Sequence, residues 1–437
     1  MTTRITHTLA AALLGFSALT SAGSALAETI AVTGARILTM GPAGEIASGT
    51  VVATDGKITA VGADVQVPSG ARIIDGAGRI VTPGIIAANS TLSGVEVSAH
   101  DAAEDLSAAD PDLSAAFDVQ YGLNPNSTLI PIARTGGVTR AIVTPELPGG
   151  DEAHGIVFAG QAAAIHLAPG YELLMKPGVA MVLALGEDAT ERSGGTRGTA
   201  LLALKGALEE ARAYHEDPDA YEEGESRPYR QSRADLKALG SVIRGEQPLL
   251  IRVHRAADIL QVLRLAEEER VRIILEGAEE AWMVADRIAA AKVPVVVNTL
   301  ANLPAHFETL GATLENAAKL HAAGVTVAIQ GSRAGHYARQ TRYNAGNAVA
   351  QGMPPAAALA AITINPARIF GLDKQVGSIE PGKEADLVVW SGDPLEISSQ
   401  PEAVFIKGVE TPLETRGRAL AERYRNLDPD GYPPAYR

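Results

Sequence analysis

The chain contains no cysteine. Disulfide bonds, thiolate nucleophiles and cysteine-ligated zinc sites are therefore excluded. Its stability has to come from burial of apolar side chains. With 437 residues the chain is long enough for one large domain and a smaller one.

Aromatic residues are also scarce, at 4% of the chain. The apolar residues are mostly alanine, valine, leucine and isoleucine, which fill the cores of α/β barrels and parallel sheets. Basic residues are fewer than acidic ones, 37 against 51, and the formal net charge is −14. Such a charge opposes binding to nucleic acid and to anionic membranes.

Residues 1–27 have the pattern of a cleavable signal peptide. Arg4 supplies the positive charge, segment 9–19 is apolar, and segment 25–27 fits a small-x-small cleavage site. The apolar stretch is shorter than the about 20 residues that a membrane span needs, and no later segment is long and apolar enough. We therefore expect cleavage after Ala27 and a soluble periplasmic or secreted protein.

Short β segments occupy both ends of the mature chain, with strand–helix alternation between them. In residues 28–84 the turn Asp55-Gly56 is flanked by β-branched residues, which is typical of a hairpin. Residues 369–437 return to β character and end in a proline-containing tail. Residues 85–368 alternate strand-like runs with amphipathic helices, which implies a parallel sheet. The pattern predicts a (β/α)8 TIM-type barrel beside a composite β-sandwich domain built from both chain ends.

The individual elements can be placed from their apolar spacing. In segment 256–270 the apolar residues Ile259, Leu260, Leu263 and Ala266 recur at helical spacing, with residues 267–269 on the outside. The expected strands are 140–143, 179–185, 249–253, 271–275, 294–297 and 325–329, and the expected helices are 199–215, 256–270, 279–291 and 313–323.

Three stretches resemble the amidohydrolase superfamily, particularly its periplasmic, imidazolonepropionase-like branch. They are GAGRIVTPGIIAANSTL at 76–92, PLLIRVHRAADILQVLRLAEEERVRIILE at 248–276 and GLDKQVGSIEPGKEADLVVWSGDPLE at 371–396. The first matches the entry into the barrel, and the third matches the return into the composite β domain. The resemblance extends over nearly the whole mature chain.

The resemblance implies hydrolysis of C–N bonds with one or two divalent metal ions such as zinc. The usual ligands are a His-x-His pair after strand one, a lysine or glutamate on strand four, histidines after strands five and six, and an aspartate after strand eight. The metal lowers the pKa of bound water, and the aspartate takes its proton. All these groups lie at the carboxyl-terminal mouth of the barrel.

The positions on strands one, five and four depart from that pattern. Asn89 and Thr91 stand where the His-x-His pair of strand one is expected, and amides and hydroxyls are poor zinc ligands. Strand five carries Arg252 at the ligand position, where a permanent cation repels a metal. His254 remains as its second member and is expected to be a pocket residue. Lys176 precedes and Glu187 follows strand four, which has no lysine of its own.

The remaining positions depart as well. Gly277 follows Glu276 where strand six should present a histidine. Ser332, followed by Arg333, stands where strand eight should present the aspartate. Ser332 lacks the Gly-x-Ser-x-Gly context of a serine hydrolase, and no phosphate-binding or dinucleotide motif is present.

Other histidines do not replace the missing ligands in the sequence pattern. None of them shares the i, i+2 or i, i+4 spacing that is typical of a compact metal site. They are His154, His166, His306 and His336. We therefore expect no metal cofactor, in contrast to intact relatives. The alternative is a metal site formed by residues that are distant in the sequence and meet only in the folded chain.

Three functional hypotheses remain. The first is a C–N hydrolase by descent that has lost its metal centre and binds a small-molecule or peptide-like ligand as a pseudoenzyme. The second is an active hydrolase with a rearranged metal site or a metal-free mechanism. The third is a structural partner of an intact paralogue. The sequence is compatible with a homo-oligomer and with such a hetero-oligomer. The expected pocket consists of Asn89, Thr91, Arg252, His254, Glu276, Gly277, Ser332 and Arg333.

Overall fold

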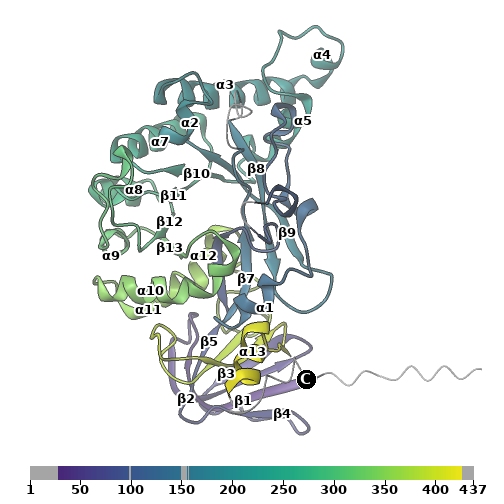
Figure 1. Cartoon of the computed structure of the whole chain (residues 1–437), viewed down its shortest axis with the longest axis vertical. Helices are drawn as coiled ribbons and strands as arrows, with labels where there is room; N and C mark the ends of the chain where they lie inside the picture. The colour runs from purple at the N-terminus through teal and green to yellow at the C-terminus, as the bar shows by residue number, and fades with distance from the viewer. Residues whose placement is uncertain (1–27, 98–99, 149–154, 156, 426–437) are drawn as a thin grey trace, which may run out of the picture.

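The structure is a computed structural model that describes residues 28–97, 100–148, 155 and 157–425. The expected signal peptide and the proline-containing end of the tail lie outside the described residues. Figure 1 shows a barrel with its helices and, below it, a smaller sheet in which segments from both chain ends lie together. Among the described helices, none combines the length and apolar composition needed to cross a membrane.

The smaller domain is composite, as expected. The strand order is β16-β15-β14-β5-β1-β2-β3, with β4 paired to β1, so the domain is a single sheet rather than two separate ones. The antiparallel pairing of β14 with β5 joins the two chain ends. The strands are β1 (Thr29–Leu38), β2 (Glu45–Thr54), β3 (Lys57–Gly62), β4 (Arg72–Asp75), β5 (Ile80–Pro83), β14 (Leu387–Trp390), β15 (Pro401–Ile406) and β16 (Val409–Glu410).

The TIM-type barrel is also confirmed. Its strand order β13-β12-β11-β10-β9-β8-β7-β6 follows the chain. The strands are β6 (Ile85–Ser90), β7 (Val138–Val143), β8 (Phe158–His166), β9 (Leu174–Ala184), β10 (Leu249–Val253), β11 (Ile273–Gly277), β12 (Val295–Asn298) and β13 (Val327–Gln330). They include all six strands that the sequence predicted for this region.

One barrel strand departs from the expected parallel arrangement. β8 runs antiparallel to both of its neighbours, β7 and β9, whereas the other paired barrel strands are parallel. The connection between β8 and β9 spans only residues 167–173. A parallel crossover needs a dozen or more residues, so this short connection can only form a hairpin.

The helices cover the outside of the barrel and close one end. The outer helices are α1 (Leu129–Arg134), α2 (Glu187–Thr190), α3 (Arg197–Glu216), α4 (Pro218–Glu222), α5 (Arg233–Ala238), α6 (Gly240–Ile243), α7 (Ala256–Glu269), α8 (Ala285–Ala290), α9 (Asn316–Ala322), α10 (Thr341–Ala350) and α11 (Pro355–Ala360). α12 (Ile364–Ile369) packs beneath β6 and β13, and α13 (Arg416–Arg425) lies near the C-terminus. Short 3-10 turns are Asp101–Ala103, Pro111–Leu113, Val119–Gly122, Ala281–Val284, Phe307–Thr309 and Gly335–Gln340.

The buried face of α7 differs from the predicted one. Ile259 and Ala266 are buried as expected, together with Val262 and Leu265. Leu260 and Leu263 are only half-buried. The apolar spacing therefore indicated the helix correctly but placed its buried face about a quarter-turn away, because the apolar side chains extend round more of the helix than the core covers.

The barrel interior is a packed core and not a channel. Inward-facing residues of successive strands, such as Ile86, Leu250 and Val296, form one cluster with Ile364 and Ala367 of α12. α12 therefore plugs the amino-terminal end of the barrel. The carboxyl-terminal mouth is therefore the end of the barrel interior that stays open, and such barrels usually carry their active site there.

Arg140 of β7 joins the barrel to the composite domain. Its side chain is fully buried and donates hydrogen bonds to both carboxylate oxygens of Asp386 and, over 2.6 Å, to Glu384. Burial by itself would lower the pKa of Arg140, but the charges and hydrogen bonds of the two carboxylates raise it. Arg140 therefore keeps its positive charge although it is buried.

Arg140→Met is expected to destabilise the protein by about 3–5 kcal/mol, because it leaves a buried carboxylate without its partner. Urea unfolding at neutral pH measures this loss. The matched control is Arg36→Met, which removes a solvent-exposed ion pair with Glu45 and is expected to leave the stability almost unchanged. Equal losses in the two variants would contradict the proposed role of the buried pair.

Candidate functional site

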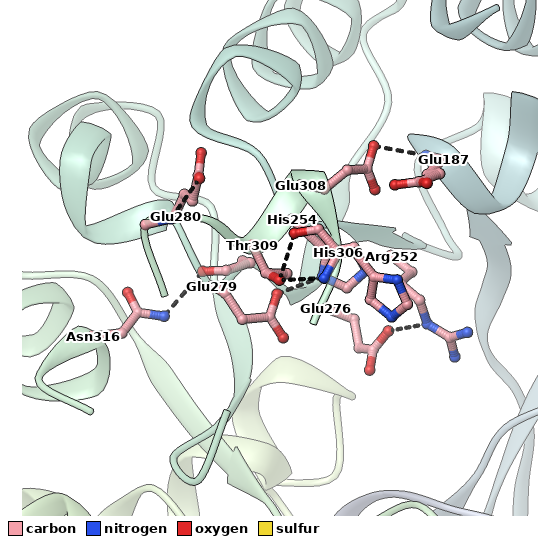
Figure 2. Close-up of polar contacts among 12 residues, drawn as sticks. Glu187, Arg252, His254, Glu276, Glu279, Glu280, His306, Glu308, Thr309 and Asn316 are labelled. Carbon is pink, nitrogen blue, oxygen red and sulfur yellow. Dashed lines mark hydrogen bonds and ion pairs between the residues drawn. The ribbon is translucent and has the colours of Figure 1, made fainter. Parts of the chain in front are cut away.

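The ends of the barrel strands bring several predicted pocket residues together. Asn89 lies near the end of β6, Arg252 near the end of β10 and Glu276 near the end of β11. Carboxyl ends of parallel strands meet at one end of a barrel, so side chains far apart in the sequence become neighbours there. Figure 2 shows Arg252 and Glu276 facing each other.

Glu276 is the centre of a polar network. One carboxylate oxygen accepts hydrogen bonds from Asn89 Nδ2 at 3.1 Å and Gln330 Nε2 at 3.0 Å, and the other accepts one from Arg252 Nε at 2.7 Å. Burial alone would raise the pKa of Glu276. The charges of Arg252 and Arg333, with the hydrogen bonds from Gln330 and Arg252, instead lower it to about 2. The carboxylate is therefore ionised and already compensated.

Arg333 extends the network on the other side of Asn89. Its Nε donates to Asn89 Oδ1 at 3.2 Å, and its Nη2 donates both to Thr144 Oγ1 at 3.1 Å and to the Pro145 carbonyl at 3.2 Å. It also forms an ion pair with Glu146 at 3.2 Å. Burial and the nearby charge of Arg252 lower the pKa of Arg333. Its donors are thus directed to protein groups.

The network also joins the first and last barrel strands. Within the described part of the chain, no ladder of hydrogen bonds pairs β13 with β6. The N–H and hydroxyl of Thr91 both donate to the Arg333 carbonyl, at 2.8 and 3.3 Å, and the Gly335 N–H donates to Thr91 Oγ1 at 3.1 Å. Side chains and loop backbone therefore close the barrel where the sheet does not.

His254 and Gly277, two further predicted pocket residues, lie next to each other. They do not belong to the hydrogen-bond network around Glu276. His254 Nδ1 is hydrogen-bonded to Glu279. Gly277 has a φ of +81°, and a Cβ at this position would lie 2.6 Å from His254 Cε1. Position 277, where the resemblance implied a histidine, therefore cannot hold a side chain while His254 keeps its place.

The protonation of His254 follows from its carboxylate neighbours. Burial would lower the pKa of His254, but the hydrogen bond and charge of Glu279, followed by the charges of Glu276 and Glu308, raise it. The folded protein therefore favours the imidazolium form. Such a side chain can donate hydrogen bonds to a ligand but is a poor metal ligand, because metals need neutral imidazole.

A cavity of about 580 Å³ lies beside His254. Its polar wall includes Glu279, Glu187 and the buried Glu308, and its apolar rim includes Leu300 and Leu303, which are 51% and 72% exposed. Glu308 accepts hydrogen bonds from Arg197 Nε and Nη2, at 2.9 and 2.7 Å, and from the Glu187 N–H at 2.7 Å. His306 also lines the cavity.

The other singled-out residues lie apart from this network. Ser332 is exposed and forms no hydrogen bond with any described residue. His166 ends the antiparallel strand β8, at the opposite end of the barrel from the mouth, and its pKa is lowered to about 4 by burial and by the charges of Lys407 and Arg140. His336 packs on Tyr337. His154 lies outside the described residues.

Three contributors were not selected from the sequence. Gln330 and Thr144 complete the network around Asn89 and Glu276, and Glu279 orients His254. Gln330 and Thr144 each lie at or just after the end of a barrel strand, which is the signal that could have identified them. Glu279 follows the Gly277 turn, so only the folded chain shows which histidine it contacts.

The residues present do not fit the divalent metal that the resemblance implies. Two guanidinium groups and an amide stand at the mouth, and the one buried carboxylate among them is already bound by Arg252. A metal ion there would be repelled by both arginines and would have to displace the ion pair. In the described ranges, no group of three or more histidine, aspartate or glutamate side chains is arranged to hold a metal.

The chain is similar in sequence to a known protein family and to curated proteins. The model of the amidohydrolase family matches residues 241–414. Amidohydrolase tasK of Hapsidospora irregularis is 25% identical over 404 residues, which is 84% of this chain and 40% of that protein. Adenine deaminase 3 of Rhizobium meliloti is 39% identical over 90 residues, or 20% of this chain and 12% of that protein. The chain thus spans less than half of the length of these relatives.

Solved structures show the same fold. The crystal structure of an amidohydrolase from Thermotoga maritima MSB8 superimposes with a TM-score of 0.78 and 28% identity, over 88% of this chain and 99% of that one. The structure of molinate hydrolase superimposes with a TM-score of 0.55 and 18% identity, over 89% of this chain and 95% of that one. The second likeness concerns the fold alone.

Glu276→Gln is expected to make the free energy of unfolding depend less on pH between pH 4.5 and 2. The folded pKa of Glu276 is about 2 against an ordinary 4.5, so the ionised group stabilises the folded state fully above pH 4.5. This contribution, about 3 kcal/mol, is lost as the pH falls from 4.5 towards 2. Urea unfolding at pH 7, 4.5 and 3 tests it, and parallel profiles for wild type and variant would refute it.

Glu279→Gln is expected to lower the pKa of His254, because the desolvation of the imidazole remains while the opposing charge is removed. An NMR titration of the histidine ring signals measures the change. The ring signal of His321 in α9, which does not line the mouth cavity, is the internal reference. A His254 signal that titrates at the same pH in both proteins would show that Glu279 does not control it.

Proposed function

The chain belongs to the amidohydrolase superfamily, and from this premise we propose that it is a ligand-binding protein without a metal-dependent hydrolytic centre. Its ligand is a small-molecule or peptide-like compound that occupies the mouth cavity beside His254. The expected signal peptide supports a site of action in the periplasm or outside the cell.

The ion pair between Arg252 and Glu276 is the observation that carries this proposal. Metal-dependent hydrolysis needs a divalent ion that activates water, and that ion needs neutral or anionic ligands. At this mouth a guanidinium is fixed 2.7 Å from the only fully enclosed carboxylate of the network. A fixed guanidinium has no open coordination position and cannot generate hydroxide from water.

The cavity beside the network has the chemistry of a binding site. Its polar wall offers the ring of His254, whose pKa is raised by Glu279, and the carboxylate of Glu187 as an acceptor, whereas Leu300 and Leu303 offer apolar contact. Binding cavities typically combine apolar walls with a few placed polar groups and enclose about 300–1,000 Å³. Such a lining suits a compound with both a polar head and an apolar part, for example an acylated amino acid or a dipeptide.

A partner subunit of an intact amidohydrolase is a second candidate function. The segment that follows β12 exposes four large apolar side chains, which is more than isolated surface residues would account for. They are Leu300, Leu303, Phe307 and Leu310, exposed by 51%, 72%, 80% and 64%. A stable complex with such a relative in size-exclusion chromatography, lost in Phe307→Ser, would favour this candidate.

The metal content of the purified protein tests the central claim. After incubation with zinc or manganese and removal of unbound ions, elemental mass spectrometry is expected to find far less than one ion per chain. A superfamily hydrolase with an intact His-x-His pair, treated in the same way, is the positive control. Stoichiometric metal, or turnover of amides that depends on added metal, would overturn the proposal.

Ligand binding is tested by the shift in thermal unfolding with a panel of N-acyl amino acids and dipeptides. A compound present at 100 times its Kd should stabilise the protein by about 2.7 kcal/mol. His254→Ala should reduce that shift, whereas His321→Ala should retain it. Equal shifts in wild type and His254→Ala would place the ligand elsewhere.

A further inference from the structure

A second and larger concavity lies at the opposite end of the barrel from the mouth. It is a groove of about 910 Å³ between α7 and α8, where Pro248, Arg272 and Pro294 lead into β10, β11 and β12. In Figure 1, α7 and α8 run along the same side of the barrel. Neither the network around Glu276 nor the cavity at His254 extends to this groove.

The floor of the groove is apolar and recessed. Its floor residues are each less than 10% exposed, and they are Val271, Ile273, Val293 and Ile369. Leu260 and Leu263 of α7, which the sequence predicted to be in the core, line the wall and remain half-buried. The apolar surface that the chain leaves uncovered in this groove therefore comes mainly from Leu260 and Leu263, above a floor that is apolar but almost closed.

The rim of the groove is basic. Five cationic side chains from α7, α8, α12 and the adjoining turns line it, and they are Arg264, Arg272, Arg287, Lys292 and Arg368. Glu267 is the one acidic residue of the lining. None of the five cations forms an ion pair with a carboxylate in the described part of the chain. This concentration of positive charge occurs on a chain with a net charge of −14.

We propose that this groove binds a single-chain anionic amphiphile. Its carboxylate or phosphate head pairs with the basic rim, and its apolar chain lies on the recessed floor. Guanidinium groups suit both kinds of head, because their paired N–H donors match two oxygens of a carboxylate or phosphate. The apolar floor adds affinity in proportion to the apolar area removed from water.

The shape and charge favour such a ligand over larger anions. A membrane-binding surface would place large apolar side chains at an exposed edge, but none of the strongly exposed large apolar residues lines this groove. A lipid bilayer would reach the rim and leave the floor uncovered. Nucleic acid would use the rim alone and would be repelled by the acidic remainder of the chain.

Isothermal titration calorimetry with the purified protein tests the proposal. The probes are decyl phosphate and decanoate below their micelle concentrations, with inorganic phosphate and the non-ionic decyl maltoside as comparisons. We expect one molecule of decyl phosphate or decanoate to bind per chain, and binding to weaken as the salt concentration rises. Inorganic phosphate or decyl maltoside should bind at least about tenfold more weakly. Inorganic phosphate has no apolar chain for the floor, and decyl maltoside has no charged head for the basic rim.

Arg287→Gln/Lys292→Gln should weaken decyl phosphate binding at least about tenfold. The matched control is Lys237→Gln/Lys374→Gln, which removes the same charge from exposed positions outside the groove and should bind as the wild type does. Circular dichroism and thermal unfolding verify that both variants fold.

Three results would overturn the proposal. The first is equal affinity in the groove and control variants, which would place the anion elsewhere. The second is equal binding of decyl maltoside or inorganic phosphate, which would remove the need for either rim or floor. The third is light scattering that shows a dimer of the wild type which the groove variant cannot form, because the groove would then belong to a second copy of the chain.

Discussion

The ion pair between Arg252 and Glu276 is the interaction on which the barrel mouth depends. A carboxylate buried this deeply is tolerated only if its charge is compensated and its lone pairs are occupied. Arg252 supplies the charge, and Asn89 and Gln330 supply the remaining donors. Since these residues come from β6, β10, β11 and β13, the same carboxylate that has to be neutralised also ties together strands that the sheet does not pair directly.

A metal centre and this network solve the same electrostatic problem in different ways. A divalent ion draws polar groups from several strands to one point and keeps a position open for water. Here the guanidinium of Arg252 supplies the positive charge, and the neighbouring side chains form hydrogen bonds with the ion pair that it makes with Glu276. Arg333 is directed to Asn89, Thr144 and Glu146, and Gly277 leaves the space that His254 occupies. Building a metal site at this mouth would therefore require changes at several strands together, because each of these residues contacts others among them.

Much of the fold could be predicted from the sequence, and the failures have physical causes. The apolar runs of β10 and β11 and the periodicity of α7 identified those elements correctly. The direction of β8 could not be predicted, because an apolar run has no direction in the sequence and only the short link to β9 makes it antiparallel. The buried face of α7 was misjudged because Leu260 and Leu263 line a groove and not the core.

The sequence alone determined which side chains stand at the strand ends, because their position follows from the length of each apolar run. It thereby predicted that an amide, a guanidinium and a glycine stand where the family resemblance implies histidine ligands. Only the tertiary structure decided what these residues do together. Glu276 receives donors that lie 187 and 54 residues away along the chain, and His254 is oriented by a glutamate beyond a left-handed turn. Such contacts exist only after the barrel closes, because closure and not sequence spacing sets which strand ends become neighbours.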